Sequence, residues 1–139
     1  MKPPDEVQRD LVRQWIEKAE QDLAAAEVLL KAGIGLRPVI AFHSQQAAEK
    51  FLKAILVRHQ VYFAKTHDLG KLLDQITLYE PVTAADLEES IALTPYGVEV
   101  RYPGDAPELL PGEELRAVEI ARQVRDAVKA LLTPYLTQT

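Results

Sequence analysis

The chain of 139 residues contains no cysteine, one tryptophan and few aromatic residues. The absence of cysteine excludes disulfide bonds, thiolate zinc sites and cysteine nucleophiles, and with them the small secreted domains that disulfides hold together. No apolar run approaches the roughly 18 residues that a membrane span requires. The first residues, Met1 to Asp5, lead into acidic residues instead of the apolar core of a signal peptide. We therefore expect a cytoplasmic protein that does not enter a membrane.

The chain also lacks an excess of positive charge. Its 16 basic and 21 acidic residues give a net charge of −5, which argues against a protein that binds nucleic acid with its whole surface. Six of the basic residues but only two acidic ones lie between Arg37 and Lys71, so this segment carries +4 and the rest of the chain −9. The asymmetry allows a local anion-binding face, but a bundle helix with several lysines in water gives the same count.

Apolar periodicity predicts two long helices within one domain that spans residues 1–139. The apolar residues from Val12 to Leu30 alternate at intervals of three and four, which predicts a helix from about Glu6 to Ala32. Pro38 suits a first helical position, and no glycine or proline follows before Gln60. Because apolar residues nearly encircle this second helix, we expect more than one neighbour to bury it.

The remaining elements are shorter, apart from the last. Thr66 is expected to cap a third helix, Pro81 to close that region, and Thr83 to open a fourth helix that ends before Pro95 and Gly97. The stretch from Val98 to Gly112 begins with a strand-like alternation and continues as a long loop. A final helix is expected near Glu113 to Leu132. The sequence thus predicts an all-α fold, an antiparallel up-and-down bundle of four to five helices.

The second helix carries a polar stripe, in which Gln46, Glu49, Lys50 and Lys53 fall within about 100° of one another and His43 borders them. Such a stripe is a candidate binding surface. The simpler interpretation is a solvated helix face on which Glu49 and Lys53 form the favourable i,i+4 pair.

Arg101 is the second candidate, because it stands apart from the other basic residues and is flanked by Tyr96 and Tyr102. An arginine can hold a phosphate with its planar guanidinium while a tyrosine stacks on a base. The alternative is an ion pair with a nearby carboxylate, for which the candidates are Glu99, Asp105 and Glu49.

The three histidines, His43, His59 and His67, are 16 and 8 residues apart, so none form the i,i+4 pair of a helical zinc site. The chain also has no glycine-rich phosphate loop and no serine in an elbow motif. We therefore expect no metal ion and no cofactor.

Four short pieces, taken together and in order, resemble the HEPN family, the higher-eukaryote and prokaryote nucleotide-binding domain. They are AEQDL (Ala19–Leu23), AFHSQQAAEKFLKA (Ala41–Ala54), THDL (Thr66–Leu69) and RYP (Arg101–Pro103). The resemblance covers roughly residues 12 to 132. It implies an all-helical bundle that pairs as a homodimer through its long helices. It also implies a companion, a minimal nucleotidyltransferase encoded nearby, in a toxin–antitoxin or related two-component system.

Other members of that family are metal-independent ribonucleases, in which an arginine and a histidine four to six residues apart lie at the dimer cleft. In this chain no histidine follows Arg101, so only the arginine carries over. Cleavage through the 2′-hydroxyl needs a group that moves a proton near neutral pH, which histidine does and arginine does not. His43 or His67 would have to take that place, and Asp105 is a poorer substitute.

Our leading hypothesis is a noncatalytic HEPN protein that binds a nucleotide, RNA or a partner nucleotidyltransferase. The expected binding residues are Gln46, Glu49, Lys50, Lys53, Arg101 and Tyr102, with Arg101 brought alongside Glu49 and Lys53 by the fold. One alternative is a ribonuclease toxin that uses Arg101 with a displaced histidine, His43 or His67. Another is a purely structural helical module that docks on a second protein.

Overall fold

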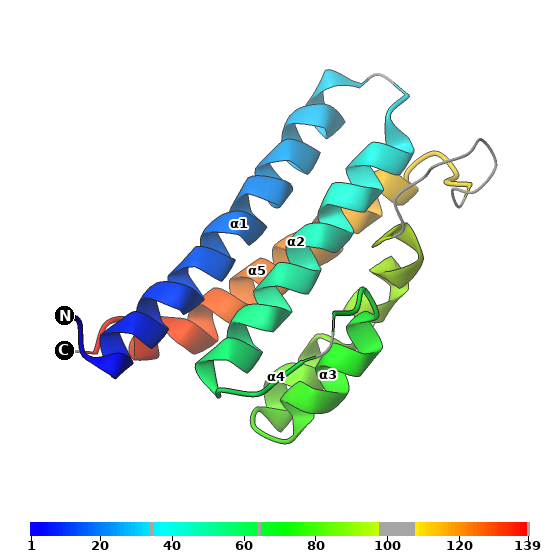
Figure 1. The fold of residues 1–139 in the computed structure, drawn as a ribbon. Coiled ribbons are helices and arrows are strands. Elements are labelled where there is room, and N and C mark those ends of the chain that lie inside the picture. Colours follow the sequence, from blue (N-terminus) through cyan, green and yellow to red (C-terminus); the bar gives the residue numbers. More distant parts are fainter. Residues whose placement is uncertain (34, 64, 98–107, 139) are drawn as a thin grey trace.

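The computed structural model describes residues 1–33, 35–63, 65–97 and 108–138 (Figure 1). Those residues form five α-helices and one 3-10 helix, and no strand occurs among them. The elements are α1 (Pro4–Ala32), α2 (Arg37–Arg58), α3 (Leu69–Thr77), α4 (Pro81–Asp86), η1 (Glu88–Gly97) and α5 (Glu113–Leu136). The chain runs up α1 and down α2, returns upward in the α2–α3 connection, descends through α3, rises through α4 and η1, and descends through α5. The predicted all-α up-and-down bundle is confirmed.

The first helix, α1, begins two residues before the predicted start, with Pro4 at its first position and two acidic residues in its first turn. Both features favour a helix N-terminus, where the proline needs no N–H partner and the helix dipole attracts negative charge. The helix ends at Ala32 and is capped by Gly33, whose φ of 68° glycine adopts at little cost. The residues that α1 buries follow the predicted spacing: Val12, Ile16, Ala19, Leu23 and Ala26.

The second helix, α2, lies at the centre of the bundle. It packs against α1, α5, α3 and η1, which confirms that more than one neighbour buries it. Phe51, Leu52, Ile55 and Leu56 are completely buried. At about 1.5 to 3 kcal/mol for each large apolar side chain removed from water, this segment is a main source of the stability of the fold.

The third helix is capped by Asp68 instead of the predicted Thr66. Asp68 has an extended backbone, and its carboxylate accepts a hydrogen bond from the backbone N–H of Lys71, at 3.2 Å. Thr66 stabilises the turn before the helix, because its hydroxyl accepts a hydrogen bond from the backbone N–H of Asp68, at 3.1 Å. An ionised carboxylate is a better acceptor than a hydroxyl at a helix N-terminus, where the dipole is positive.

Two predictions about proline are wrong. Pro81 does not close a region but opens α4, and Thr83 lies inside that helix. Pro95 and Gly97 do not interrupt the following helix, because η1 continues through Pro95 to Gly97. A proline at a first helical position replaces an N–H that would have no partner in any case, so proline marks starts as well as ends.

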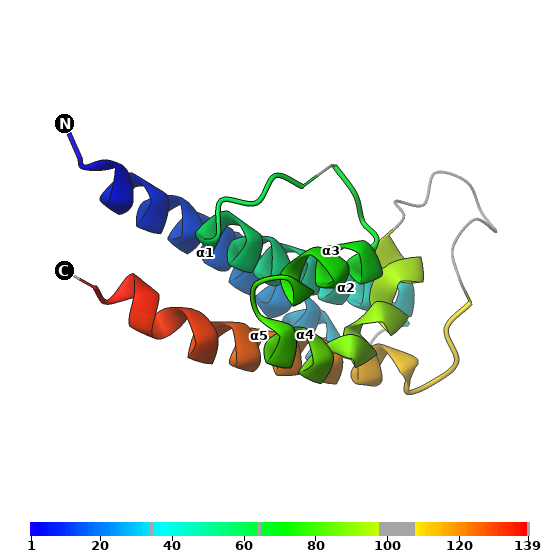
Figure 2. The same cartoon turned by 90° about the horizontal axis from the view of Figure 1, so that it is seen from below.

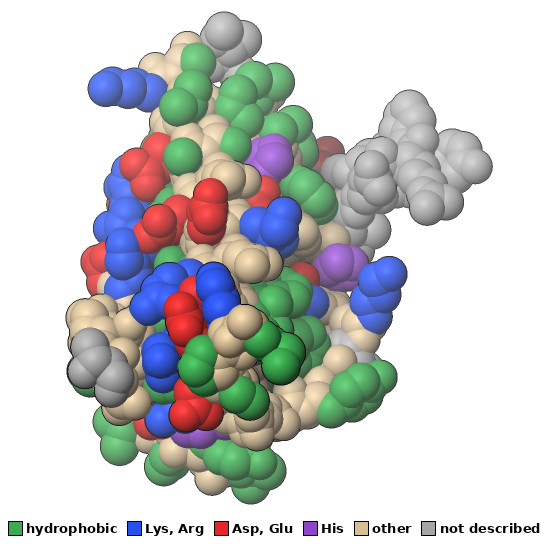
Figure 3. All heavy atoms as spheres, turned by 60° about the vertical axis from the view of Figure 1, so that its left-hand side comes forward, with side chains coloured by type: hydrophobic (Ala, Val, Ile, Leu, Met, Phe, Trp, Pro, Cys, Tyr) green, Lys and Arg blue, Asp and Glu red, His purple; other side chains and the backbone are tan. Residues whose placement is uncertain are grey.

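The last helix, α5, runs four residues beyond the predicted Leu132, with Pro134 inside its final turns. The two chain ends lie at the same end of the bundle, as Figures 1 and 2 both show. Acidic and basic side chains are interleaved on the face of the molecule that Figure 3 presents. Ion pairs also join α1 to α5, such as that of Glu20 with Lys129. The predicted strand and Arg101, Tyr102 and Asp105 lie outside the described residues.

Candidate functional site

Glu49 and Lys53 are buried, although a helix stripe of this kind was expected to be solvated. Only 3% of Glu49 and 7% of Lys53 is exposed, and Lys53 Nζ donates to Glu49 Oε2 at 2.9 Å. The i,i+4 pair is therefore present, but the solvated interpretation is wrong for these two residues. Removing two charges from water costs several kcal/mol for each ion unless partners satisfy them, so their surroundings matter.

The ammonium group of Lys53 is enclosed by two aromatic rings. Its nitrogen lies 5.8 Å from the ring centroid of Trp15 on α1 and 5.4 Å from that of Phe63 in the α2–α3 connection. The two rings meet edge to face, 6.0 Å apart. Both ring faces attract a cation, and this attraction strengthens when water is excluded. The rings therefore offset part of the desolvation cost of Lys53.

The other carboxylate oxygen of Glu49 serves His67. His67 Nδ1 lies 2.7 Å from Glu49 Oε1, and because an ionised carboxylate only accepts, Nδ1 is the donor. The His67 side chain is 61% exposed, whereas that of Glu49 is 5% exposed. The buried carboxylate thus fixes the orientation of an imidazole that reaches into solvent, and leaves its Nε2 without a partner among the described residues.

Gln45 completes this arrangement, which we call the Glu49 network (Gln45, Glu49, Lys53 and His67). The fully buried Gln45 amide donates to Glu49 Oε1 at 3.2 Å and to the backbone carbonyl of His67 at 3.1 Å. The Gln46 side-chain amide donates to the side-chain oxygen Oε1 of Gln45 at 2.7 Å. Residues 45, 49 and 53 are one helical turn apart, which is the signal that sequence reasoning could have used to find Gln45.

Lys50 belongs to a second cluster, so the predicted stripe is divided. Lys50 is paired with Asp22 of α1, and His43 Nδ1 lies 2.9 Å from the other oxygen of the same carboxylate. Asp22 was not among the predicted binding residues, although it stands in the AEQDL piece of the sequence. His43 and Lys50 therefore face Asp22, while Glu49 and Lys53 face the α2–α3 connection.

The predicted site residues Arg101 and Tyr102 lie outside the described residues, so their expected position beside Glu49 stays a prediction. The last described residue before them, Gly97, is buried and lies against Gln45. A Cβ atom added to Gly97 would be 2.7 Å from Gln45 Cδ. Tyr96, the other predicted neighbour of Arg101, is partly buried against the core. Burial raises the pKa of its hydroxyl, and the charge of Glu113 adds to this effect.

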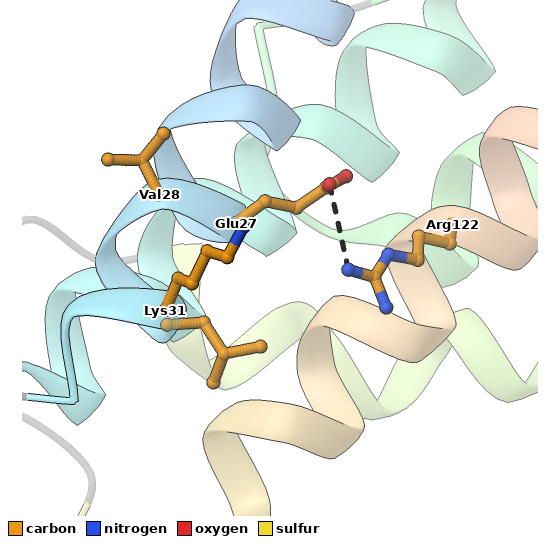
Figure 4. Close-up of a pocket in the computed structure, with 5 residues that line it drawn as sticks. Glu27, Val28, Lys31 and Arg122 are labelled. Atoms are coloured by element: carbon orange, nitrogen blue, oxygen red, sulfur yellow. Dashed lines mark ion pairs between the residues drawn. The ribbon is translucent and has the colours of Figure 1, made fainter.

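Among the residues that the structure describes, no group of three or more His, Asp or Glu side chains could hold a metal ion. None of the described helices is long and apolar enough to cross a membrane. A groove of about 420 Å³ lies between α1 and α5, lined by Glu27, Val28, Leu30, Lys31 and Arg122. Figure 4 shows Arg122 reaching across it to Glu27, at 3.6 Å. This groove includes none of the predicted site residues.

The sequence matches the HEPN domain family over residues 12–131, which is most of the chain. This chain belongs to the HEPN family. The HEPN match spans the region from α1 to α5, including the Glu49 network. The predicted resemblance and fold class are therefore confirmed.

One curated relative of this HEPN chain is a Methanocaldococcus jannaschii protein named "Putative toxin MJ1304". The two are 41% identical over 51 residues, which is 37% of this chain and 32% of the relative. The chain thus matches about a third of the length of that curated relative. No solved structure gives a significant match.

Proposed function

We propose that this chain is a toxin-like HEPN protein that binds a nucleotide or RNA where His67 emerges from the Glu49 network. The observation that supports this proposal is the buried Glu49 carboxylate, which is shared between a buried lysine and an exposed histidine. A module that only docks on another protein needs no such buried ion pair, because apolar residues of similar volume stabilise a core as well or better. The name of the Methanocaldococcus jannaschii relative supports a toxin-like role.

Arg101 and Tyr102 are proposed to complete this site, together with Gln46, Glu49, Lys50 and Lys53. Arg101 is the fourth residue after Gly97, and a fully extended chain of four residue steps spans at most about 14 Å. Gly97 touches Gln45, which donates a hydrogen bond to Glu49. A position beside the network is compatible with this span, and we propose that the guanidinium of Arg101 holds a phosphate there.

Titration of the purified protein with AMP, ATP and a short RNA tests this proposal. Arg101→Ala and His67→Ala are expected to weaken binding by about tenfold or more, the loss of one charge-assisted hydrogen bond. His59→Ala is the matched control, because His59 pairs with Glu80 on the α3–α4 side and belongs to no proposed site. No binding by the wild type, or equal binding by Arg101→Ala, would contradict the proposal.

A second candidate function is a metal-independent ribonuclease, and the orientation of His67 favours it. A histidine whose Nδ1–H is held by a carboxylate has Nε2 available as a general base. His43 has the same contact with Asp22, but its side chain is 29% exposed and its carboxylate is also paired with Lys50. His67 is therefore the better substitute for the histidine that is missing after Arg101.

In that reaction His67 Nε2 takes the proton of a 2′-hydroxyl, and the 2′-oxygen attacks the adjacent phosphorus. The bond from phosphorus to the 5′-oxygen breaks, and that oxygen leaves with a proton from water. RNA cleavage in the presence of a chelator, yielding a cyclic phosphate and lost in His67→Ala, would support this function. Cleavage that survives in His67→Ala, or none at all by the wild type, would contradict it.

We further propose that the chain forms a homodimer and associates with a minimal nucleotidyltransferase. Support for a dimer comes from α2, where Val39 is 42% exposed and Phe42, whose ring lies edge to face with that of His43, is only partly buried. Light scattering after gel filtration is expected to give twice the mass of 15.5 kDa. A monomer, or a Val39→Glu variant that dimerises like the wild type, would contradict an interface on α2.

A further inference from the structure

Trp15, the single tryptophan of the chain, contacts two parts of the molecule that meet at the candidate site. It lies on α1 and is half-buried. Its ring is edge to face with that of Phe63 at 6.0 Å, and the ammonium nitrogen of Lys53 is 5.8 Å from its centroid. Trp15 therefore adjoins both the buried lysine of the Glu49 network and the connection that carries His67.

The contact with Lys53 bears on where that ammonium group lies. Lysine has a flexible stem and a strongly hydrated head, so the head turns toward water wherever nothing holds it. Only 7% of Lys53 is exposed, and the rings of Trp15 and Phe63 attract its charge. The rings thus favour the buried position, in which Lys53 Nζ donates to Glu49 Oε2 at 2.9 Å.

The position of Lys53 matters to His67 because both groups bind one carboxylate. Glu49 Oε2 is taken by Lys53, and Oε1 lies 2.7 Å from His67 Nδ1. With this geometry His67 carries its proton on Nδ1. A lysine that turned to solvent would admit water to the carboxylate, and water would compete with His67 for Oε1. The proton of the neutral imidazole would then no longer be fixed on Nδ1.

The contact with Phe63 bears on the backbone that carries His67. Phe63 stands four residues before His67 in the α2–α3 connection, and its ring packs on that of Trp15. The backbone carbonyl of His67 is held separately, by the Gln45 amide at 3.1 Å. The connection is thus attached to the bundle at Phe63 and again at His67, and loss of the Trp15 ring would loosen the first attachment.

We propose that Trp15 is a positioning residue for His67, which acts through Lys53 and Glu49 and through Phe63 without touching a ligand. Its contacts join α1 to the buried pair on α2 and to the connection that bears the imidazole. Side chains behind a site often fix the geometry of the residues that meet the ligand. The proposal rests on the proposed function, because it explains how Nε2 of His67 is kept available there.

NMR of the ring nitrogens of His67 in the ligand-free protein tests this proposal, because it distinguishes a proton on Nδ1 from one on Nε2. The wild type is expected to give the Nδ1–H tautomer alone. In Trp15→Leu the two tautomers should be mixed, whereas Trp15→Phe keeps a ring face for Lys53 and should restore the wild-type signals. Phe63→Leu removes the other ring and should also mix the tautomers, which gives a second variant should Trp15→Leu fail to fold.

AMP affinity provides a second readout on the same variants. Trp15→Leu should weaken binding by about threefold to tenfold, a part of what one charge-assisted hydrogen bond contributes. Trp15→Phe should bind within about twofold of the wild type, because the cation keeps an aromatic face.

Two controls separate positioning from general damage to the fold. Tyr135→Leu removes an aromatic ring from a different cation, since the guanidinium carbon of Arg58 lies 4.1 Å from the Tyr135 ring centroid. Neither of these residues belongs to the polar network, so Tyr135→Leu should leave the His67 signals unchanged. His43 belongs to the other polar cluster and is the internal reference, whose signals should not change in Trp15→Leu.

The positioning role would be overturned by a single Nδ1–H tautomer of His67 in Trp15→Leu, or by tautomers mixed equally in Trp15→Leu and Trp15→Phe. A change in Tyr135→Leu as large as that in Trp15→Leu would also overturn it. If His67→Ala loses AMP while Trp15→Leu binds it like the wild type, the positioning role fails and the proposed function stands. If the wild type binds neither AMP nor RNA, the proposed function fails, and the NMR signals still decide whether Trp15 fixes the tautomer.

Discussion

Glu49 is the residue on which the polar interior of this bundle depends, because its two carboxylate oxygens serve different partners. One accepts from the buried Lys53, and the other accepts from Gln45 and from the exposed His67. Without Glu49, a lysine would lie between Trp15 and Phe63 with no counter-charge. The same residue thus joins the stability of the fold to the candidate site.

Glu49→Ala is expected to destabilise the protein by about 3 kcal/mol or more, since removing one partner leaves a buried charge unpaired. Urea denaturation followed by circular dichroism measures this change. The double variant Glu49→Leu with Lys53→Met removes both charges and should recover most of the stability. A single variant within about 1 kcal/mol of the wild type would contradict the burial of the pair.

Glu114, at the start of α5, makes the stability of the fold depend on pH in the acidic range. Burial alone raises the pKa of Glu114, but the backbone N–H groups of Glu114 and Gly112 and the Arg37 guanidinium together hold it below its usual range. Arg37 Nε and Glu114 Oε2 are 3.0 Å apart, although their geometry makes no hydrogen bond. Their attraction is therefore mainly Coulombic.

Because the pKa of Glu114 is lowered on folding, its contribution to stability is present above the pKa of the unfolded chain. It is lost as the pH falls through the folded value. Glu114→Gln should therefore lower the melting temperature at pH 7. The difference in melting temperature between the variant and the wild type should become smaller as the pH falls from about 5 to about 3. Thermal melts across that range measure the difference. A gap that is constant with pH would contradict the lowered pKa.

At the scale of elements, the long helices were predictable because their apolar residues recur with the helical period. The ends of the short elements were not. The sequence pattern predicts that Pro81 ends a region, yet Pro81 occupies the first position of α4, and Pro95 lies inside η1. Proline restricts φ and removes one N–H, and both effects are compatible with a helix start or a 3-10 turn. Tertiary packing then adds to these local effects, since η1 packs on α2 and α4 packs on α3.

The contact between η1 and α2 at Gly97 is tight enough to test. Gly97→Ala would place a Cβ atom 2.7 Å from Cδ of Gln45, whose buried amide is held by three hydrogen bonds. We expect Gly97→Ala to lower the free energy of unfolding by about 1 to 3 kcal/mol, the usual cost of overpacking a core. The double variant Gly97→Ala with Gln45→Ala should lose less free energy of unfolding than the two single variants lose in sum. Additive losses would show that the two residues do not touch.

At the scale of the whole molecule, the sequence predicted which helix carries the polar residues but not how they are arranged. Angular positions on α2 placed Lys50 in one stripe with Glu49 and Lys53, whereas the bundle turns Lys50 toward Asp22 on α1. The burial of Glu49 could not be predicted from α2 alone. It depends on Phe63 and His67, which fold back from the α2–α3 connection.

The central claim is that His67, held by Glu49, meets the same ligand as Arg101. A double-mutant cycle on AMP affinity tests this most directly, with Arg101→Ala, His67→Ala and the combined variant compared by calorimetry. If both side chains contact one ligand, the combined variant should bind hardly more weakly than the weaker single variant, with a coupling energy of about 1 kcal/mol or more. If the losses of binding free energy in the two single variants add up to the loss in the combined variant within about 0.5 kcal/mol, a shared site is contradicted.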